Sequence, residues 1–184
     1  NVGPKVAPGK YNIKMTYNDQ ILQKEFEIVK DPRVKISQAD YQDQLEFLIN
    51  VRDEVSRANQ KIIDIRNIKN NMTFIRDKSS NNLELQELIN KYLTDISEIE
   101  NNIHMTKNQS RQDPLNYGIR INNRIAFLLA DSQRGDYPPT DQSKEFFIQI
   151  KEELDTEILK LDALIDKHSQ KIENYLEENK IELI

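Results

Sequence analysis

The stretch from Leu85 to Ile103, LQELINKYLTDISEIENNI, decides the fold class of this chain. Its apolar residues recur in alternating steps of four and three: Leu85, Ile89, Tyr92, Ile96, Ile99 and Ile103. Such steps place apolar side chains along one face of an α-helix, and the strict alternation is typical of helices that pack against other helices. The sequence therefore predicts an amphipathic helix that belongs to a larger helical assembly.

Two longer apolar series lie on either side of this stretch. The first extends to about Lys78 with steps that average about 3.4 residues, close to the coiled-coil repeat; its members are Tyr41, Leu45, Leu48, Val51, Val55, Ala58, Ile62, Ile65, Ile68, Met72 and Ile75. Ser37 is its predicted N-cap, with Asp40 as the partner in a capping box. The second series follows Thr140 and consists of Phe147, Ile150, Leu154, Ile158, Leu161, Ile165, His168, Ile172 and Tyr175.

A shorter helix is predicted between the last two long ones. Asp113 and Pro114 are its expected N-cap and first helical residue, and its apolar face carries Ile121, Ile125 and Leu128. Because short turns join the four helices, we predict a mainly α fold: an uneven up-down-up-down four-helix bundle preceded by a short β-hairpin. The residues chosen to represent the predicted core are Leu48, Val55, Ile96, Leu154 and Leu161.

The hairpin is predicted from residues 10–30, where the apolar period changes to two. Tyr11, Ile13, Met15 and Tyr17 alternate with polar residues, as in a half-buried strand. Asn18-Asp19 suits a type I′ turn, and this turn sets Met15 opposite Leu22 and Tyr11 opposite Phe26. A lone hairpin is only marginally stable in water, so the apolar face needs a cover.

The predicted cover is the end of the bundle at which the first helix begins and the last helix ends. The residues expected there are Tyr41, Leu45, Tyr175, Leu176, Ile181, Leu183 and Ile184. At least one strand edge is still expected to stay open for pairing with another chain.

Composition excludes several classes of function. The net charge is −5, whereas nucleic acids and anionic membranes attract proteins with basic surfaces. There is no cysteine, hence no disulfide and no thiolate metal site. No apolar run approaches the roughly 20 residues that span a bilayer. The opening residues, 1–4, are neither an initiator methionine nor a signal peptide, and we interpret the chain as an excised fragment.

Two groups of residues resemble a known family. The stretch from Pro8-Gly9 to Asp31-Pro32 resembles the last hairpin of an immunoglobulin-like segment. Residues 113–124, DPLNYGIRINNR, followed by Gly135-Asp136 and Pro139-Thr140, resemble the C-terminal region of bacterial sortilin-like (VPS10-type) glycosyl-hydrolase-related proteins.

In that family a β-propeller of BNR or WD40-like repeats comes first, followed by a β-rich segment and a helical tail. The resemblance implies a hairpin remnant in residues 1–33, a helical bundle in residues 34–184, and the preceding β-propeller or β domain of the parent chain as partner. Hydrolytic residues would lie in the propeller, so no functional residue is carried over. The compartment is not readable from the chain, and the resemblance is compatible with a parent exported to the periplasm or cell surface.

The leading functional hypothesis is a non-catalytic structural or interaction module without cofactors. Neighbouring carboxylates such as Glu152 and Glu153 point apart on a helix surface, whereas a glycosidase opposes two across a cleft. No phosphate-binding loop and no nucleophile motif is present.

Two alternatives remain. A glycan- or peptide-binding module would use the 113–124 segment, with Tyr117, Arg120, Asn123 and Arg124 as binding residues, because Arg can clamp carboxylates and Asn can hydrogen-bond sugars. These same residues could instead fix helix ends. A metal-dependent helical enzyme would use Glu100 and His104, one helical turn apart, although di-iron bundles need more ligands than that. We expect His168 to be a partly buried bundle residue rather than a ligand.

Overall fold

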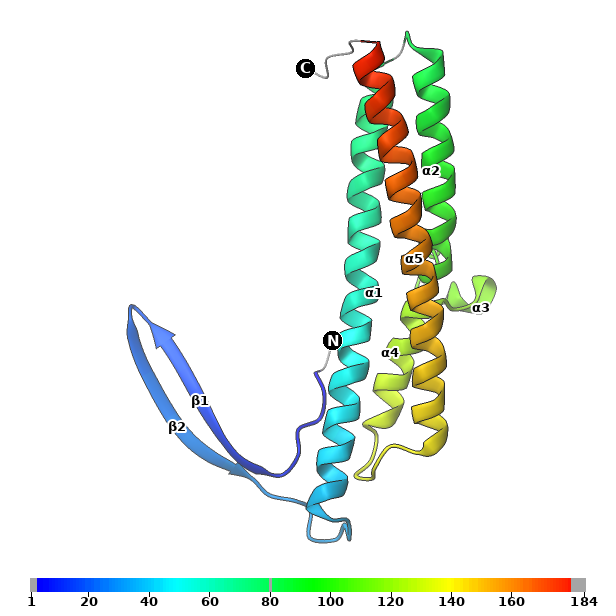
Figure 1. Ribbon diagram of the computed structural model, residues 1–184. Coiled ribbons are helices and arrows are strands. Elements are labelled where there is room, and N and C mark those ends of the chain that lie inside the picture. Colours follow the sequence, from blue (N-terminus) through cyan, green and yellow to red (C-terminus); the bar gives the residue numbers. More distant parts are fainter. Residues whose placement is uncertain (1–2, 80, 180–184) are drawn as a thin grey trace. The chain divides into compact units, whose positions relative to one another are not determined.

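The computed structural model describes residues 3–79 and 81–179 and is mainly helical (Figure 1). Helices contain 66% of the described residues, well above the roughly one-third typical of globular domains. The elements are β1 (Gly9–Tyr17), β2 (Gln20–Ile28), α1 (Gln38–Lys78), α2 (Leu83–Ile103), α3 (Pro114–Tyr117), α4 (Ile121–Ser132) and α5 (Asp141–Glu178). The predicted combination of long helices with one hairpin is thereby confirmed.

The chain divides into two compact units. The first contains the residues up to Asp53 together with Ala126–Phe147, and the second contains Glu54–Ile125 together with the residues from Ile148 onward. The hairpin therefore belongs to the first unit and α2 to the second. Helices α1, α4 and α5 each contribute residues to both.

Helix α1 begins as its sequence predicts. The backbone N–H of Asp40 donates a hydrogen bond to Ser37 Oγ (3.2 Å), and the backbone N–H of Ser37 donates to Asp40 Oδ2 (2.8 Å). This reciprocal pair is a capping box, which satisfies donors that the first helical turn leaves unpaired. The helix then ends at Lys78, the predicted residue.

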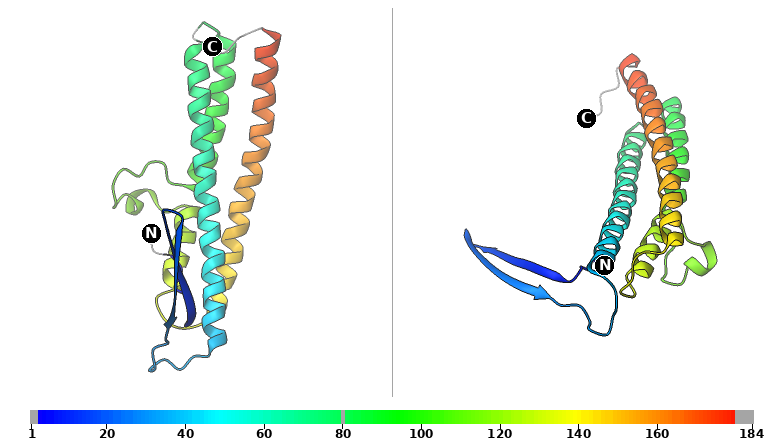
Figure 2. Two further views of the ribbon diagram at one scale, coloured as in Figure 1. Left: turned by 90° about the vertical axis from the view of Figure 1, so that its left-hand side faces the viewer. Right: turned by 60° about the horizontal axis from the view of Figure 1, so that its bottom comes forward.

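Three helices lie side by side in the second unit (Figures 1 and 2). The antiparallel course of α1 and α2 follows from the contacts of Arg66 with Glu100 and of Arg76 with Asn90. The antiparallel course of α2 and α5 follows from the contacts Asn102–Glu157 and Asn82–Tyr175. The parallel course of α1 and α5 follows from the ion pairs Arg57–Asp155 and Lys61–Asp162.

The core of the second unit follows the apolar spacing of α2. All six residues of the Leu85–Ile103 series are buried, and the side chain of Asn82 caps the helix by accepting a hydrogen bond from the backbone N–H of Leu85 (3.0 Å). Of the five core residues predicted for the molecule, Leu48, Ile96, Leu154 and Leu161 are buried. Val55 is only partly buried, so the prediction for that residue was too strong.

The predicted third helix is interrupted, which corrects the sequence interpretation. Helix α3 ends at Gly118, whose φ of 73° and ψ of −179° lie outside helical geometry, and α4 starts only at Ile121. Glycine adopts this conformation without the steric penalty of a Cβ atom. The Asp113 side chain forms no hydrogen bond with the start of α3. Consequently Arg120 lies before α4 rather than inside a helix that begins at Pro114.

The hairpin has the predicted register. Met15 pairs with Leu22 and Tyr11 with Phe26. Asn18 and Asp19 both have positive φ, 44° and 61°, as a type I′ turn requires. Local sequence is sufficient here, because a two-residue turn together with side-chain alternation leaves one favourable register.

Candidate functional site

One face of the hairpin is apolar and exposed. Alternation along the paired strands puts seven side chains on this hairpin apolar face: Tyr11, Ile13, Met15, Tyr17, Leu22, Phe26 and Ile28. Ile13 is 57% exposed, Met15 54% and Leu22 62%. Soluble proteins rarely leave so many neighbouring large apolar side chains in water unless they form a contact surface.

Within the described residues of the first unit, the hairpin apolar face does not have its predicted cover. Tyr41 is buried, but its hydroxyl group contacts Asp136 rather than the hairpin. The hydroxyl of Tyr175 donates a hydrogen bond to Asn82 Oδ1 (2.9 Å) at the start of α2. The last three predicted cover residues, Ile181, Leu183 and Ile184, lie outside the described part of the chain. For Ile13, Met15 and Leu22, which stay exposed, the expectation of a cover from the start of α1 was therefore wrong.

The opposite face of the hairpin is charged, and the two strands differ in sign. Lys10 and Lys14 lie on β1, whereas Glu25 and Glu27 lie on β2. The Lys10 ammonium and the Glu25 carboxylate are 3.6 Å apart. Within residues 3–79 and 81–179 the sheet consists of β1 and β2 alone, so the outer edge of each strand has no strand beside it. Unpaired edges of this kind offer free backbone groups to another strand.

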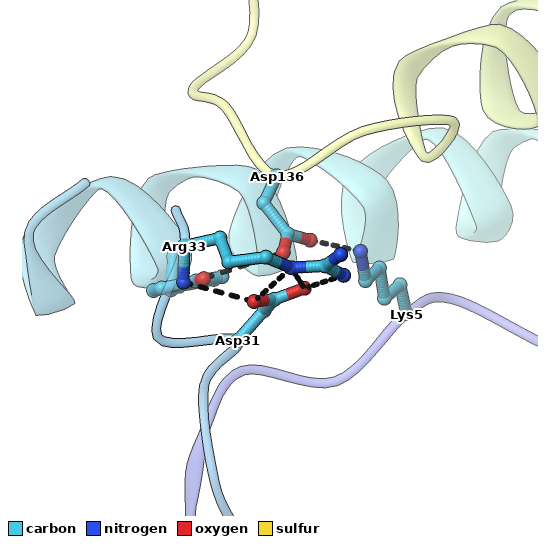
Figure 3. A network of polar contacts seen from close by, with 5 residues as sticks. Lys5, Asp31, Arg33 and Asp136 are labelled. Carbon is cyan, nitrogen blue, oxygen red and sulfur yellow. Dashed lines mark hydrogen bonds and ion pairs between the residues drawn. The ribbon is translucent and has the colours of Figure 1, made fainter. Parts of the chain in front are cut away.

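A polar network holds the segments that flank the hairpin (Figure 3). The carboxylate of Asp136, from the loop after α4, forms an ion pair with Lys5 and accepts a hydrogen bond from the Tyr41 hydroxyl (3.3 Å). Burial and the negative charge of Asp136 raise the pKa of Tyr41. On the other flank, Arg33 binds Asp31 through its guanidinium group and its backbone N–H, and these hydrogen bonds lower the pKa of the Asp31 carboxyl. We call these five residues the anchor network.

Two further hydrogen bonds fix the same region. The side-chain amide of Gln44, which is buried on α1, donates to the carbonyl oxygens of Ser132 (2.9 Å) and Gly135 (2.8 Å). The side-chain amide of Gln38 donates to the carbonyl oxygen of Pro8 (2.9 Å), directly before β1. The Gly135-Asp136 pair, noted in the sequence as part of a resemblance, thus serves in this structure to tie the loop after α4 to α1 and to Lys5.

The four predicted binding residues differ in what surrounds them. Tyr117 is exposed at the end of α3, and Asn123 is exposed on α4. Arg124 forms a two-pronged ion pair with Glu153 on α5, at 2.6 and 3.2 Å, so its guanidinium group is already engaged. Arg120 is partly buried, and its Nε atom has no hydrogen-bond partner among the described residues. Sequence reasoning missed Lys107, whose ammonium group lies 6.0 Å from the ring centre of Tyr117.

The residues of the metal hypothesis have other partners. Glu100 is buried, and its two carboxylate oxygens accept hydrogen bonds from Arg66 (2.9 Å) and Lys69 (2.8 Å). Burial alone would raise the pKa of Glu100, but these two cations outweigh it and lower the pKa. His104 Nδ1 lies 3.2 Å from the side-chain amide nitrogen of Asn122. Among the residues that the structure describes, no group of three His, Asp or Glu side chains is placed to hold a metal ion.

His168 is buried in the second unit. Its ring stacks on Tyr92, with the centroids 4.7 Å apart and the planes at 3°. Nε2 lies 3.3 Å from Asp95 Oδ2 but without hydrogen-bonding geometry. Burial lowers the pKa of His168, and the opposing effect of Asp95 is smaller. His168 thus lies on the apolar seam as predicted, but it is buried rather than partly buried.

Comparison of the chain with protein families, with curated proteins and with solved structures gives no match. No helix in the described part of the chain combines the length and apolar character that crossing a membrane requires.

Proposed function

We propose that this chain is a non-catalytic interaction module whose hairpin docks on a separate β-sheet domain. The observation that carries the proposal is the exposed hairpin apolar face. Removing a large apolar side chain from water stabilises a complex by about 1.5–3 kcal/mol. Several such side chains on one face therefore provide a strong drive for association once a matching surface is available.

The chemistry of the hairpin favours a β-sheet as the occupant. Its apolar side chains share one face of a two-stranded sheet, and the faces of two sheets pack together in β-sandwiches. Its outer edges also offer unpaired backbone groups, which an added strand satisfies. A β domain supplies both contacts at once, whereas a helix supplies only the first.

The charges on the hairpin disfavour a second copy of this chain as that occupant. In a symmetric pairing through β1, Lys10 and Lys14 of the two copies would approach each other. In a symmetric pairing through β2, Glu25 and Glu27 would do so. Like charges on neighbouring strands are destabilising. Pairing β1 of one copy with β2 of the next matches the charges. That contact is head-to-tail, however, and head-to-tail contacts that do not close into a ring generate filaments.

The sortilin-like resemblance agrees with this proposal. It suggests that the β domain is the β-rich segment or the propeller of the parent chain. The helical module would then pack against the propeller or hold it at a fixed distance, and it would not catalyse a reaction. The up-down-up-down order expected from the sequence is not part of the proposal, because α1 and α5 run parallel and α4, like α2, runs antiparallel to α1.

Hydrogen exchange tests the proposal. The chain is compared alone and within the intact gene product, provided that the gene encodes a β domain before residue 1. Amides of β1 and β2 are expected to exchange rapidly in the isolated chain and to be strongly protected in the intact protein. Leu22→Asp is expected to abolish that protection, while the control Leu159→Asp, at an exposed position of α5, is expected to retain it. Fast exchange of the hairpin in the intact protein would contradict the proposal.

A further inference from the structure

The connection between α2 and α4 is long for a compact helical protein. It runs through residues 104–120 and contains only the short helix α3. In Figures 1 and 2 α3 lies to the side of α2 and α5. Connections between packed helices usually take only a few residues, and longer ordered ones are generally functional. We call this segment the 104–120 loop.

The loop has a defined internal structure. The carboxylate of Asp113 accepts hydrogen bonds from the backbone N–H groups of Gln109 (2.6 Å) and Ser110 (2.8 Å) and from the Ser110 hydroxyl (2.6 Å). These hydrogen bonds lower the pKa of Asp113. Pro114 restricts the backbone that follows, and Met105 is buried at the base of the loop. A loop that is ordered before binding loses less conformational entropy when a partner arrives.

This ordered loop presents apolar side chains to solvent. Leu115 is 86% exposed, Ile119 54% and Tyr117 46%, and all three lie within a few residues of one another. An isolated exposed apolar residue is ordinary, whereas three within five residues of a structured loop are not; we call Leu115, Tyr117 and Ile119 the apolar patch. The hydrogen bonds that order the loop involve Asp113, Gln109 and Ser110 and not these apolar side chains. The internal structure of the loop therefore does not explain why the apolar side chains are exposed.

The loop is also basic, in contrast to the net charge of −5 of the whole chain. Among the described residues no carboxylate lies within ion-pair distance of Lys107, Arg111 or Arg120, whereas Asp113 is engaged inside the loop. The ammonium group of Lys107 lies 6.0 Å from the ring centre of Tyr117. The Nε atom of Arg120 is buried without an acceptor. Three cations without an ion-pair partner among the described residues therefore lie in the same loop as the apolar patch, and an anionic ligand could pair with them.

We propose that the 104–120 loop is a docking site for an acidic peptide segment of another protein. Apolar side chains of the peptide pack on Leu115, Tyr117 and Ile119, and its carboxylates pair with Lys107, Arg111 and Arg120. Charge-assisted hydrogen bonds from Arg to a carboxylate are among the strongest polar contacts in proteins. The apolar patch favours a peptide over a neutral glycan, and three cations on an acidic protein are too few to favour a lipid surface. This site is separate from the hairpin and does not rest on the function proposed for it.

Fluorescence anisotropy with short synthetic peptides tests the proposal. The probe peptide contains Asp, Glu, Leu and Phe; a second has Lys and Arg in place of the acids, and a third has Ser in place of Leu and Phe. We expect the acidic apolar peptide to bind more tightly than both others by about tenfold or more. Added salt is expected to weaken its binding, because exposed charges are screened.

Variants separate the loop from the rest of the surface. Lys107→Ala combined with Leu115→Ser is expected to reduce affinity for the acidic peptide by about tenfold or more without altering the helical circular dichroism signal, because both side chains are exposed. The matched control, Arg134→Ala combined with Leu159→Ser, changes an exposed cation and an exposed leucine elsewhere and is expected to bind normally. Equal loss in both variants, absence of binding, or preferential binding of neutral oligosaccharides or anionic vesicles would overturn the proposal.

Discussion

At the scale of single residues, the described polar groups of the interior illustrate what the sequence alone cannot supply. The spacing of the sequence assigns Glu100 to a helix face. Its partners Arg66 and Lys69 lie on another helix, α1, and are 34 and 31 residues away along the chain. Arg124 likewise reads as a free cation in the sequence and is paired with Glu153 on α5. Residue identity predicts that a charge needs a partner, whereas only the packing of helices determines which partner it finds.

The first prediction concerns the buried histidine. Because the pKa of His168 is lowered in the folded protein from its ordinary value of 6.5, the folded state binds its proton less readily than the unfolded state does. The contribution of this histidine to the free energy of unfolding is therefore fully present above the pKa of the unfolded state. It is lost as the pH falls through the pKa of the folded state. Asp95 opposes the shift, while burial, Lys167 and Lys171 favour it.

We expect the free energy of unfolding in urea to decrease between about pH 7.5 and about pH 5.5, partly through this histidine. His168→Phe keeps an aromatic ring on Tyr92 and removes the titration, so its pH dependence is expected to be flatter in this range. A variant that loses stability as steeply as the parent protein would show that other groups control the effect.

The second prediction concerns the buried carboxylate. Glu100→Gln removes the negative charge that faces Arg66 and Lys69. Leaving hydrogen-bonded groups without their partner costs about 1–3 kcal/mol, and the partial exposure of the two cations keeps the loss toward the lower end. The control Glu98→Gln, two residues earlier and exposed, is expected to change stability by less than about 0.5 kcal/mol. Similar urea midpoints for both variants would contradict the structural role of Glu100.

At the scale of elements, local signals predicted the strands and the long helices well. The hairpin register followed from the Asn18-Asp19 turn and side-chain alternation, and the start of α1 followed from Ser37 and Asp40. The break before α4 was missed because the apolar spacing of Ile121, Ile125 and Leu128 does not reveal where a helix begins. Gly118 carried the only warning, since a glycine near a helix end often adopts positive φ. The proposed binding loop was recognised as a segment, but its shape and its cation Lys107 were not.

The third prediction tests the faces of the long helices. Truncation to alanine of Leu48, Ile96, Leu154 or Leu161 is expected to cost about 2–5 kcal/mol, the usual range for a large-to-small change in a core. Val55→Ala is expected to cost less, because Val55 is only partly buried. Lys91→Ala and Glu152→Ala, both at exposed positions, are expected to cost under about 0.5 kcal/mol. Urea denaturation measures all of these, and equal losses in the core and surface groups would mean that the helical faces are rotated.

At the scale of the whole molecule, two of the described segments each have several exposed apolar side chains close together in the sequence. The hairpin apolar face has several exposed apolar side chains between open strand edges, which favours a β-sheet as partner. The 104–120 loop is small and basic, as suits a short acidic segment. The interaction module proposed above rests on these two surfaces, whereas the periodicity of the sequence predicts only a helical scaffold.

The last prediction asks whether the hairpin is needed for that scaffold. Deletion of residues 1–33 removes both strands and also Lys5, the partner of Asp136, and Ala7, which is buried. We expect the remaining chain to stay folded and helical by circular dichroism, because the described apolar side chains of the hairpin are largely exposed and contribute little to any core. A modest loss of stability is expected from the missing ion pair and from Ala7.

A second variant separates these contributions. Replacing residues 10–28 by a short Gly-Ser linker removes the hairpin but keeps Lys5, Ala7 and the Asp31–Arg33 pair of the anchor network. Its urea midpoint is expected to equal that of the intact chain. The difference between the two variants then measures the anchor network together with Ala7 and the Gln38–Pro8 hydrogen bond. If the linker variant instead unfolds cooperatively at a much lower urea concentration, the hairpin is integral to the folding of this chain, and its apolar face cannot be reserved for a separate β domain.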